Sequence, residues 1–168
     1  MRADLIIDGM SWETATISGM DASEAVVALV RRLGREDLGG VLLHGSVIAG
    51  YNVVDLHYIH DATRLPVISV SQEPQSNLRG ILQAKFSKDW QSRWRIVEQN
   101  GPLQPLHLPT GDTVFLQCYG TEADTAGELV KRLTRFGGIP EPLRVARLLA
   151  RVLTASRGPN KPEADPSD

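Results

Sequence analysis

The amino-acid sequence predicts an α/β domain in which strands alternate with helices. Two short apolar runs, residues 41–43 and 65–70, have the composition of strands buried on both faces of a parallel sheet. A segment with helical periodicity, from about residue 53 to 62, separates these two runs. Strand, helix and strand in this order form a right-handed βαβ unit. We therefore expect a parallel pair of strands inside the domain.

Composition restricts the classes of protein that this chain can represent. The 168 residues are 42% hydrophobic and 23% charged, with a formal net charge of −2, so any nucleic-acid surface must be local. Cys118 is the only cysteine, which excludes an intramolecular disulfide and favours a reducing compartment. Because the sequence shows no secretory segment and no apolar stretch that could span a membrane, we expect a cytoplasmic protein.

The residues before the first helix carry two β-like pieces and a candidate cap. Residues 4–7 and 14–17 predict a hairpin or one bent edge strand. An apolar stripe predicts a helix over residues 24–33, which Gly34 ends. Asp21 precedes this helix, and a carboxylate at that position can cap the first turn.

The second half of the chain continues the alternation of helices and strands. The predicted elements are helices at 78–86, 90–99, 123–136 and 139–153, and a strand at 114–119 paired with residues 106–108. Trp90 and Trp94 recur at helical spacing, which favours core or groove-lining roles over base-stacking platforms. We place one domain at residues 1–156 and a disordered polar tail at residues 157–168.

Seven polar residues are candidates for a functional site. They are Asp21, His44, Asn52, Asp55, Glu141, Arg144 and Arg147. They do not form a nucleophile triad, a phosphate loop or a four-ligand zinc site. His44 follows the strand at 41–43, and ligands of open α/β sheets bind beyond the carboxyl ends of strands.

Besides Asp21, five of these candidates also have a structural explanation. His44 is equally interpreted as a solvated strand end beside a turn. Asn52 and Asp55 can cap the helix that follows them. Glu141 and Arg144 have the i,i+3 spacing of a local ion pair at a helix start. Residue chemistry alone therefore stops at an α/β domain.

Five segments nevertheless follow one another in the order of a known family. They are Gly-Met-Asp-Ala-Ser at 19–23, His-Gly-Ser-Val-Ile-Ala-Gly-Tyr-Asn-Val-Val-Asp at 44–55, Leu-Pro-Val-Ile at 65–68, Phe-Ser-Lys-Asp-Trp at 86–90 and Gly-Ile-Pro-Glu-Pro-Leu-Arg-Val-Ala at 138–146. Over roughly residues 5–156 the chain resembles the archaeal endonuclease dU family, which is similar to endonuclease V.

This resemblance implies a fold and an activity. The implied fold is a ribonuclease-H-like, endonuclease-V-like mixed sheet flanked by helices, here lacking the first strand or two. The implied activity is metal-dependent endonuclease cleavage of DNA at deaminated bases, such as deoxyuridine, in DNA repair. Mg²⁺ would be the cofactor, because hard divalent cations prefer clustered carboxylate oxygens.

The resemblance also implies roles for the candidate residues. Asp21 matches a metal-ligating acid, and His44 stands where the family has a catalytic aspartate. Arg147 stands where the family commonly has a histidine. The implied supporting or substrate-binding residues are Asn52, Asp55, Glu141, Arg144 and Arg147. An imidazole suits Mg²⁺ poorly, and a fixed positive charge opposes a metal and favours a phosphate contact.

Two functional hypotheses follow from the resemblance and these departures. The first is a metal-dependent endonuclease that acts on deaminated DNA. The second is a catalytically degenerate module on the same fold that binds nucleic acid or another partner. A purely structural partner is a third possibility, because exposed sheet edges can pair with another chain. The sequence leaves the oligomeric state open, a homo-oligomer included.

Overall fold

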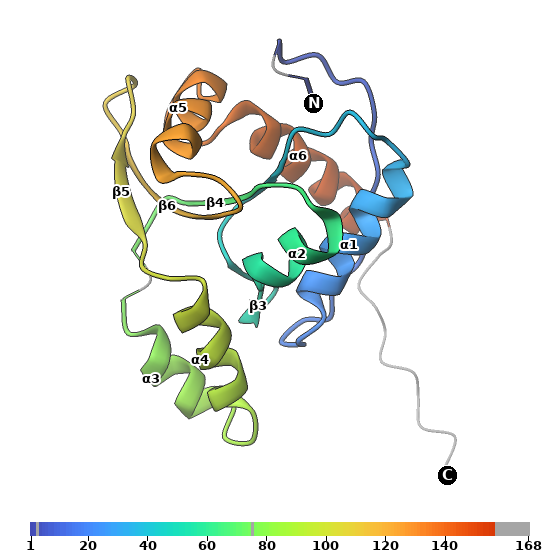
Figure 1. Ribbon diagram of the computed structural model, residues 1–168. Coiled ribbons are helices and arrows are strands. Elements are labelled where there is room, and N and C mark those ends of the chain that lie inside the picture. The colour runs from blue at the N-terminus through green and yellow to red at the C-terminus, as the bar shows by residue number, and fades with distance from the viewer. Residues whose placement is uncertain (3, 75, 157–168) are drawn as a thin grey trace.

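A four-stranded mixed sheet lies between two layers of helices (Figure 1). The computed structural model describes residues 1–2, 4–74 and 76–156. In the order β1-β4-β6-β5, strand β1 (Val41–Leu43) pairs parallel with β4 (Val67–Ser71). The predicted parallel pair is therefore confirmed, and so is the mixed α/β class.

The other half of the sheet is antiparallel. Strand β6 (Thr113–Tyr119) pairs with β4 on one side and with β5 (Gln104–His107) on the other. All five residues of β4 are buried, as expected for a strand with neighbours on both sides and helices on both faces. In the described part of the chain β1 pairs only with β4 and is half-buried, so the prediction that residues 41–43 are a fully buried strand was wrong.

Each face of the sheet has its own hydrophobic core. Helices α1 (Ala22–Leu33) and α2 (Leu56–Thr63) cover one face around Val67. Helices α5 (Ala123–Leu133) and α6 (Glu141–Ser156) cover the other face. The second core contains Ile68, Val70, Val114, Leu116, Val130 and Leu143. Alternation along β4 therefore sends successive side chains to opposite cores.

A pair of helices extends away from these layers. Helices α3 (Leu78–Lys85) and α4 (Trp90–Gln99) pack on each other at the lower left of Figure 1. Their bounds agree with the predicted helices to within one residue. Among the described residues, no helix has the length and apolar character needed to cross a membrane.

The predicted strands before the first helix are absent from the structure. Residues 4–21 contain no strand, and Leu5 and Ser18 have φ angles of 68° and 60°, which extended strands do not allow. Ile6 and Ile17 are 54% and 79% exposed. An alternating pattern forms a stable strand only when a neighbouring strand pairs with it, and none of the described residues does so here.

Some other boundaries also differ from the prediction. The helix expected from residue 53 begins at Leu56, because the preceding residues form a short hairpin of β2 (Val47–Ile48) and β3 (Asn52–Val53). Gly50 turns this hairpin with a φ of 70°. Helix α5 ends three residues before the predicted Phe136. The polar tail at 157–168 lies outside the described residues.

Candidate functional site

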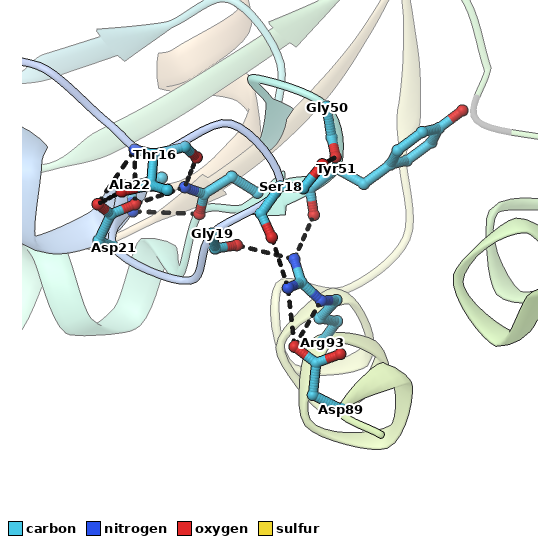
Figure 2. A network of polar contacts seen from close by, with 10 residues as sticks. Thr16, Ser18, Gly19, Asp21, Ala22, Gly50, Tyr51, Asp89 and Arg93 are labelled. Atoms are coloured by element: carbon cyan, nitrogen blue, oxygen red, sulfur yellow. Dashed lines mark hydrogen bonds and ion pairs between the residues drawn. The ribbon is translucent and has the colours of Figure 1, made fainter. Parts of the chain in front are cut away.

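Asp21 directs its carboxylate towards Thr16. The backbone N–H of Thr16 donates to both carboxylate oxygens, at 3.0 and 3.1 Å, and its hydroxyl donates to Oδ2 at 2.6 Å (Figure 2). The Asp21 side chain makes no capping hydrogen bond to α1, so the predicted cap was wrong. The carboxylate instead closes the loop that leads into the helix.

Asn52 provides the cap of α1 from a distant part of the chain. Its Oδ1 accepts the backbone N–H of Ala22 at 3.1 Å, and its Nδ2 donates to Asp21 Oδ1 at 2.6 Å and to the Thr16 carbonyl at 3.0 Å. Asn52 is completely buried. It therefore caps α1 and not the following helix, contrary to the structural alternative considered for it. Asp55 does cap its own helix, because Oδ1 accepts the N–H of Tyr58 at 3.0 Å.

Hydrogen bonding keeps Asp21 ionised. The Thr16 hydroxyl, followed by the Asn52 amide, lowers the pKa of the Asp21 carboxyl below its usual value, because both groups stabilise the charged form. Gly19 leaves room for this arrangement. A Cβ at Gly19 would lie 2.9 Å from Asp21 Oδ1 and 2.7 Å from the Thr16 Cβ. The site thus holds a fixed negative charge beside a turn that requires glycine.

Arg93 of α4 binds the two turns next to Asp21. Its side chain is 3% exposed, and its guanidinium donates to the carbonyls of Ser18, Gly19 and Tyr51 at 2.8 to 2.9 Å (Figure 2). It also pairs with Asp89 at 2.8 Å. The i,i+4 spacing signals only the Asp89 pair in the sequence. The three carbonyl partners depend on tertiary packing, so sequence reasoning missed Arg93.

His44 and Arg147 influence each other at the carboxyl end of β1. His44 follows the strand and is exposed to solvent. Burial of part of its ring, and then the positive charge of Arg147, lower the pKa of His44 below its usual value. Both effects disfavour the imidazolium, so the ring is mainly neutral near pH 7.

Three arginines share one exposed face of α6. Arg144, Arg147 and Arg151 have spacings of three and four residues, which place them along one side of a helix. Arg144 is paired with Glu141 through its Nε at 3.0 Å and through Nη2, as predicted. No ion pair of Arg147 or Arg151 is present in the described part of the chain.

Glu141 holds an incompletely satisfied carboxylate at the start of α6. Its Oε2 accepts from Arg144, whereas Oε1 is buried without a hydrogen-bond partner among the described residues. The whole residue is 8% exposed. The structure therefore divides the seven candidates among four places. Asp21 lies with Asn52, His44 with Arg147, and Glu141 with Arg144, while Asp55 caps its own helix.

These residues do not fit a magnesium ion. Residues 1–2, 4–74 and 76–156 contain no group of three His, Cys, Asp or Glu side chains that could hold a metal. Both oxygens of Asp21 already accept hydrogen bonds, and the acid position at His44 holds an imidazole next to an arginine charge. Mg²⁺ requires a near-octahedral set of oxygen ligands, commonly with one or two carboxylates. A single carboxylate whose oxygens already accept hydrogen bonds does not provide such a ligand set.

Comparison with known structures defines the class of this protein. The fold is that of endonuclease V, a ribonuclease-H-like fold: human ENDOV superposes with a TM-score of 0.50 at 17% identity, over 82% of this chain and 64% of that one. A protein of unknown function from Archaeoglobus fulgidus superposes with a TM-score of 0.70 at 29% identity, over 82% and 77% of the two chains.

Sequence comparison defines the family. Residues 1–154 match the family described as endonuclease dU, and the chain belongs to that family. A UPF0215 protein of Methanothermobacter thermautotrophicus is 34% identical over 159 residues, which cover 90% of this chain and 76% of the relative. A UPF0215 protein of Thermococcus kodakarensis is 34% identical over 151 residues, which cover 89% and 76%. The resemblance to the endonuclease dU family is thereby confirmed.

Proposed function

We propose that this chain acts on DNA that carries deaminated bases, deoxyuridine in particular, as a cytoplasmic DNA-repair protein. The observation that carries the proposal is the arginine face of α6, which reaches the carboxyl end of β1 beside His44. Arginine guanidinium groups recognise phosphates through several donors at once. Membership of the family described as endonuclease dU supports a deaminated base as the target. Endonuclease V of Ciona intestinalis, with a TM-score of 0.51, was solved with DNA containing inosine, which supports nucleic acid as the ligand.

Binding is the part of this function that the described side chains support. Arg147 and Arg151 offer two exposed cations with no carboxylate partner in the described part of the chain. A neutral His44 can donate or accept one hydrogen bond next to a phosphate without adding charge. Because the net charge of the whole chain is −2, DNA affinity should depend strongly on this one face.

Mg²⁺-dependent cleavage is the second candidate function. Its support is the family match together with the ionised carboxylate of Asp21. If a metal binds, it would supply charge stabilisation and an activated water. Its ligand set would then have to include groups beyond the described arrangement, because these residues do not fit the ion.

Salt-dependent binding tests the proposed function. Fluorescence anisotropy with a 24-base-pair duplex containing one deoxyuridine should give a dissociation constant that rises with salt, without any divalent cation. The double variant R147Q/R151Q should weaken binding by about tenfold or more, because two phosphate contacts are lost. The matched control is Arg31→Gln, an exposed arginine on α1. If Arg31→Gln weakens binding as much as R147Q/R151Q does, the assignment of DNA binding to α6 is contradicted.

A nicking assay separates the two candidate functions. The same duplex, and a control duplex with thymidine in place of deoxyuridine, would be incubated with Mg²⁺ or Mn²⁺ and resolved on a denaturing gel. Binding without nicking is the expected result. Nicking of the deoxyuridine strand that disappears in Asp21→Asn would establish the second candidate and contradict the degenerate site.

A further inference from the structure

A hollow lies between the α3–α4 pair and the loop before β5. Its volume is about 500 Å³, which is within the usual range of small-molecule sites. Trp94, Val97 and Glu98 line it from α4, and Arg79 lines it from α3. Leu103 of the loop contributes to the apolar part of the wall. None of the seven predicted site residues takes part in this hollow.

Arg79 gives the hollow a cation with uncommitted donors. The centre of its guanidinium lies 5.6 Å from the ring centroid of Trp94 and 5.9 Å from that of Trp90. In the described part of the chain these ring contacts are its only partners, since no hydrogen bond or ion pair to it is present. Contact with the two indoles restricts where the guanidinium can go while its N–H groups stay available to an anion.

The lining selects a particular kind of ligand. Trp94, Val97 and Leu103 favour a flat, apolar ring, and base–aromatic stacking contributes about 1–3 kcal/mol per base. Arg79 favours a phosphate attached to that ring. Glu98 disfavours a ligand that is anionic throughout, but its carboxylate can accept from the amino group of a base. A volume of about 500 Å³ is too small for a double helix and large enough for one unstacked nucleotide.

We infer that this hollow binds one nucleotide of a single-stranded nucleic acid, with the base against Trp94 and the phosphate on Arg79. The inference rests on the proposed function, because it assigns nucleic acid, the ligand proposed for α6, to a second site on the same protein. Helix α4 also contacts the turns next to Asp21. Arg93, the residue next to Trp94, holds the turns that carry Ser18, Gly19 and Tyr51. Trp94 lines the hollow, as predicted, and the inference also gives it the base-stacking role that the sequence pattern disfavoured.

Tryptophan fluorescence tests the inference directly. In the W12F/W90F double variant, Trp94 is the only tryptophan left of the three, and a phenylalanine keeps an aromatic ring at position 90 beside Arg79. Titration with an eight-nucleotide oligodeoxythymidylate at low salt should quench this fluorescence to a plateau. Adding Arg79→Gln should weaken the apparent affinity about tenfold, and adding Leu103→Trp, read by anisotropy of a labelled oligonucleotide, should block binding by filling the hollow. The control is Arg95→Gln, an exposed arginine of α4 that does not line the hollow.

The outcomes distinguish the inference from its alternatives. Equal weakening by Arg79→Gln and Arg95→Gln would mean general charge attraction and would overturn the inference. Quenching by thymidine monophosphate at the same concentrations as the oligonucleotide would assign the hollow to a free nucleotide and overturn the single-strand assignment. If R147Q/R151Q abolishes duplex binding but quenching of Trp94 persists, the two sites are separate, as inferred. If duplex binding through α6 holds and the oligonucleotide leaves Trp94 unquenched, only the further inference fails.

Discussion

Asn52 donates a 2.6 Å hydrogen bond to the carboxylate of Asp21 and, with its other side-chain atom, caps the helix that Asp21 precedes. One buried amide from β3 therefore holds both the start of α1 and the charge in front of it. The family resemblance predicted a metal-ligating role for this acid, which stays a prediction. Here the acid is part of a closed hydrogen-bond network, so its first role is structural.

Replacing Asn52 by alanine should lower the free energy of unfolding by about 3 kcal/mol, because it leaves the Ala22 N–H and the Thr16 carbonyl without their partner. Urea unfolding followed by circular dichroism would measure the change. Gln83→Ala on the exposed surface of α3 is the matched control and should change stability by less than about 0.5 kcal/mol. A loss of similar size in both variants would contradict the capping role.

Replacing Arg93 by alanine should destabilise the fold by about 3 kcal/mol, because several carbonyls and the Asp89 carboxylate lose a common donor. Arg93→Lys should recover only part of the loss, since an ammonium lacks the planar arrangement of donors. Arg95→Ala, two residues further along α4, provides the control. Full recovery by lysine would show that charge alone, and not the guanidinium geometry, is needed.

The pKa of His44 should lie below 6.5 in the native protein and should rise in Arg147→Gln, since the substitution removes the second cause of the shift. Burial is the larger cause, so the rise should be partial. Proton NMR titration of the His44 ring measures both values, and Arg151→Gln tests whether a neighbouring charge has the same effect. An unchanged pKa in Arg147→Gln would contradict the placement of Arg147 beside His44.

The same shift predicts how stability depends on pH. A histidine whose pKa is lower in the folded state binds a proton more readily when unfolded, so its contribution to stability falls as the pH drops below the unfolded value of 6.5. The loss stops once the pH is below the folded pKa. Unfolding midpoints at pH 8 and pH 5 should therefore differ less in His44→Gln than in the natural protein. If the midpoints differ by the same amount in both proteins, groups other than His44 cause the pH dependence.

Adding Mg²⁺ should leave the thermal unfolding midpoint unchanged, because the described residues provide no cluster of three metal-binding side chains. A ligand at 100 times its dissociation constant would stabilise the native state by about 2.7 kcal/mol, so a specific site would be seen easily. The comparison is between 10 mM MgCl₂ and excess chelator at constant ionic strength. A stabilisation that saturates with Mg²⁺ and is lost in Asp21→Asn would contradict the prediction.

Exchanging the imidazole for a carboxylate tests whether the residue at position 44 makes the site unsuitable for a metal. The double variant H44D/R147Q restores an acid and removes the opposing charge, so it should bind Mg²⁺ or Mn²⁺ more tightly than the natural protein. Isothermal titration calorimetry measures the affinity, and Arg147→Gln alone separates the effect of charge from that of the new ligand. If the double variant gains no affinity for either metal ion, the natural histidine at position 44 is not what prevents metal binding.

Local patterns in the sequence were sufficient for most helices and for the central strands. The run at 65–70 and the periodicity of residues 90–99 are set by burial, which repeats every two or 3.6 residues and is visible in the chain itself. Asp55 and the Glu141–Arg144 pair were predictable for the same reason, because their partners are three residues away. Family resemblance added the endonuclease V fold, which no local pattern contains.

Only the tertiary structure decided the arrangement around Asp21. Thirty-one residues separate Asn52 from Asp21, and more than seventy separate Arg93 from the carbonyls of Ser18 and Gly19. Hydrogen bonds of this range depend on how helices and turns pack, and packing leaves no periodic signal in a single sequence. The residues at 4–7 failed as a strand for the same reason, since a strand exists only with a partner. The sequence by itself thus determined the class of fold and the family, while packing decided which polar groups meet.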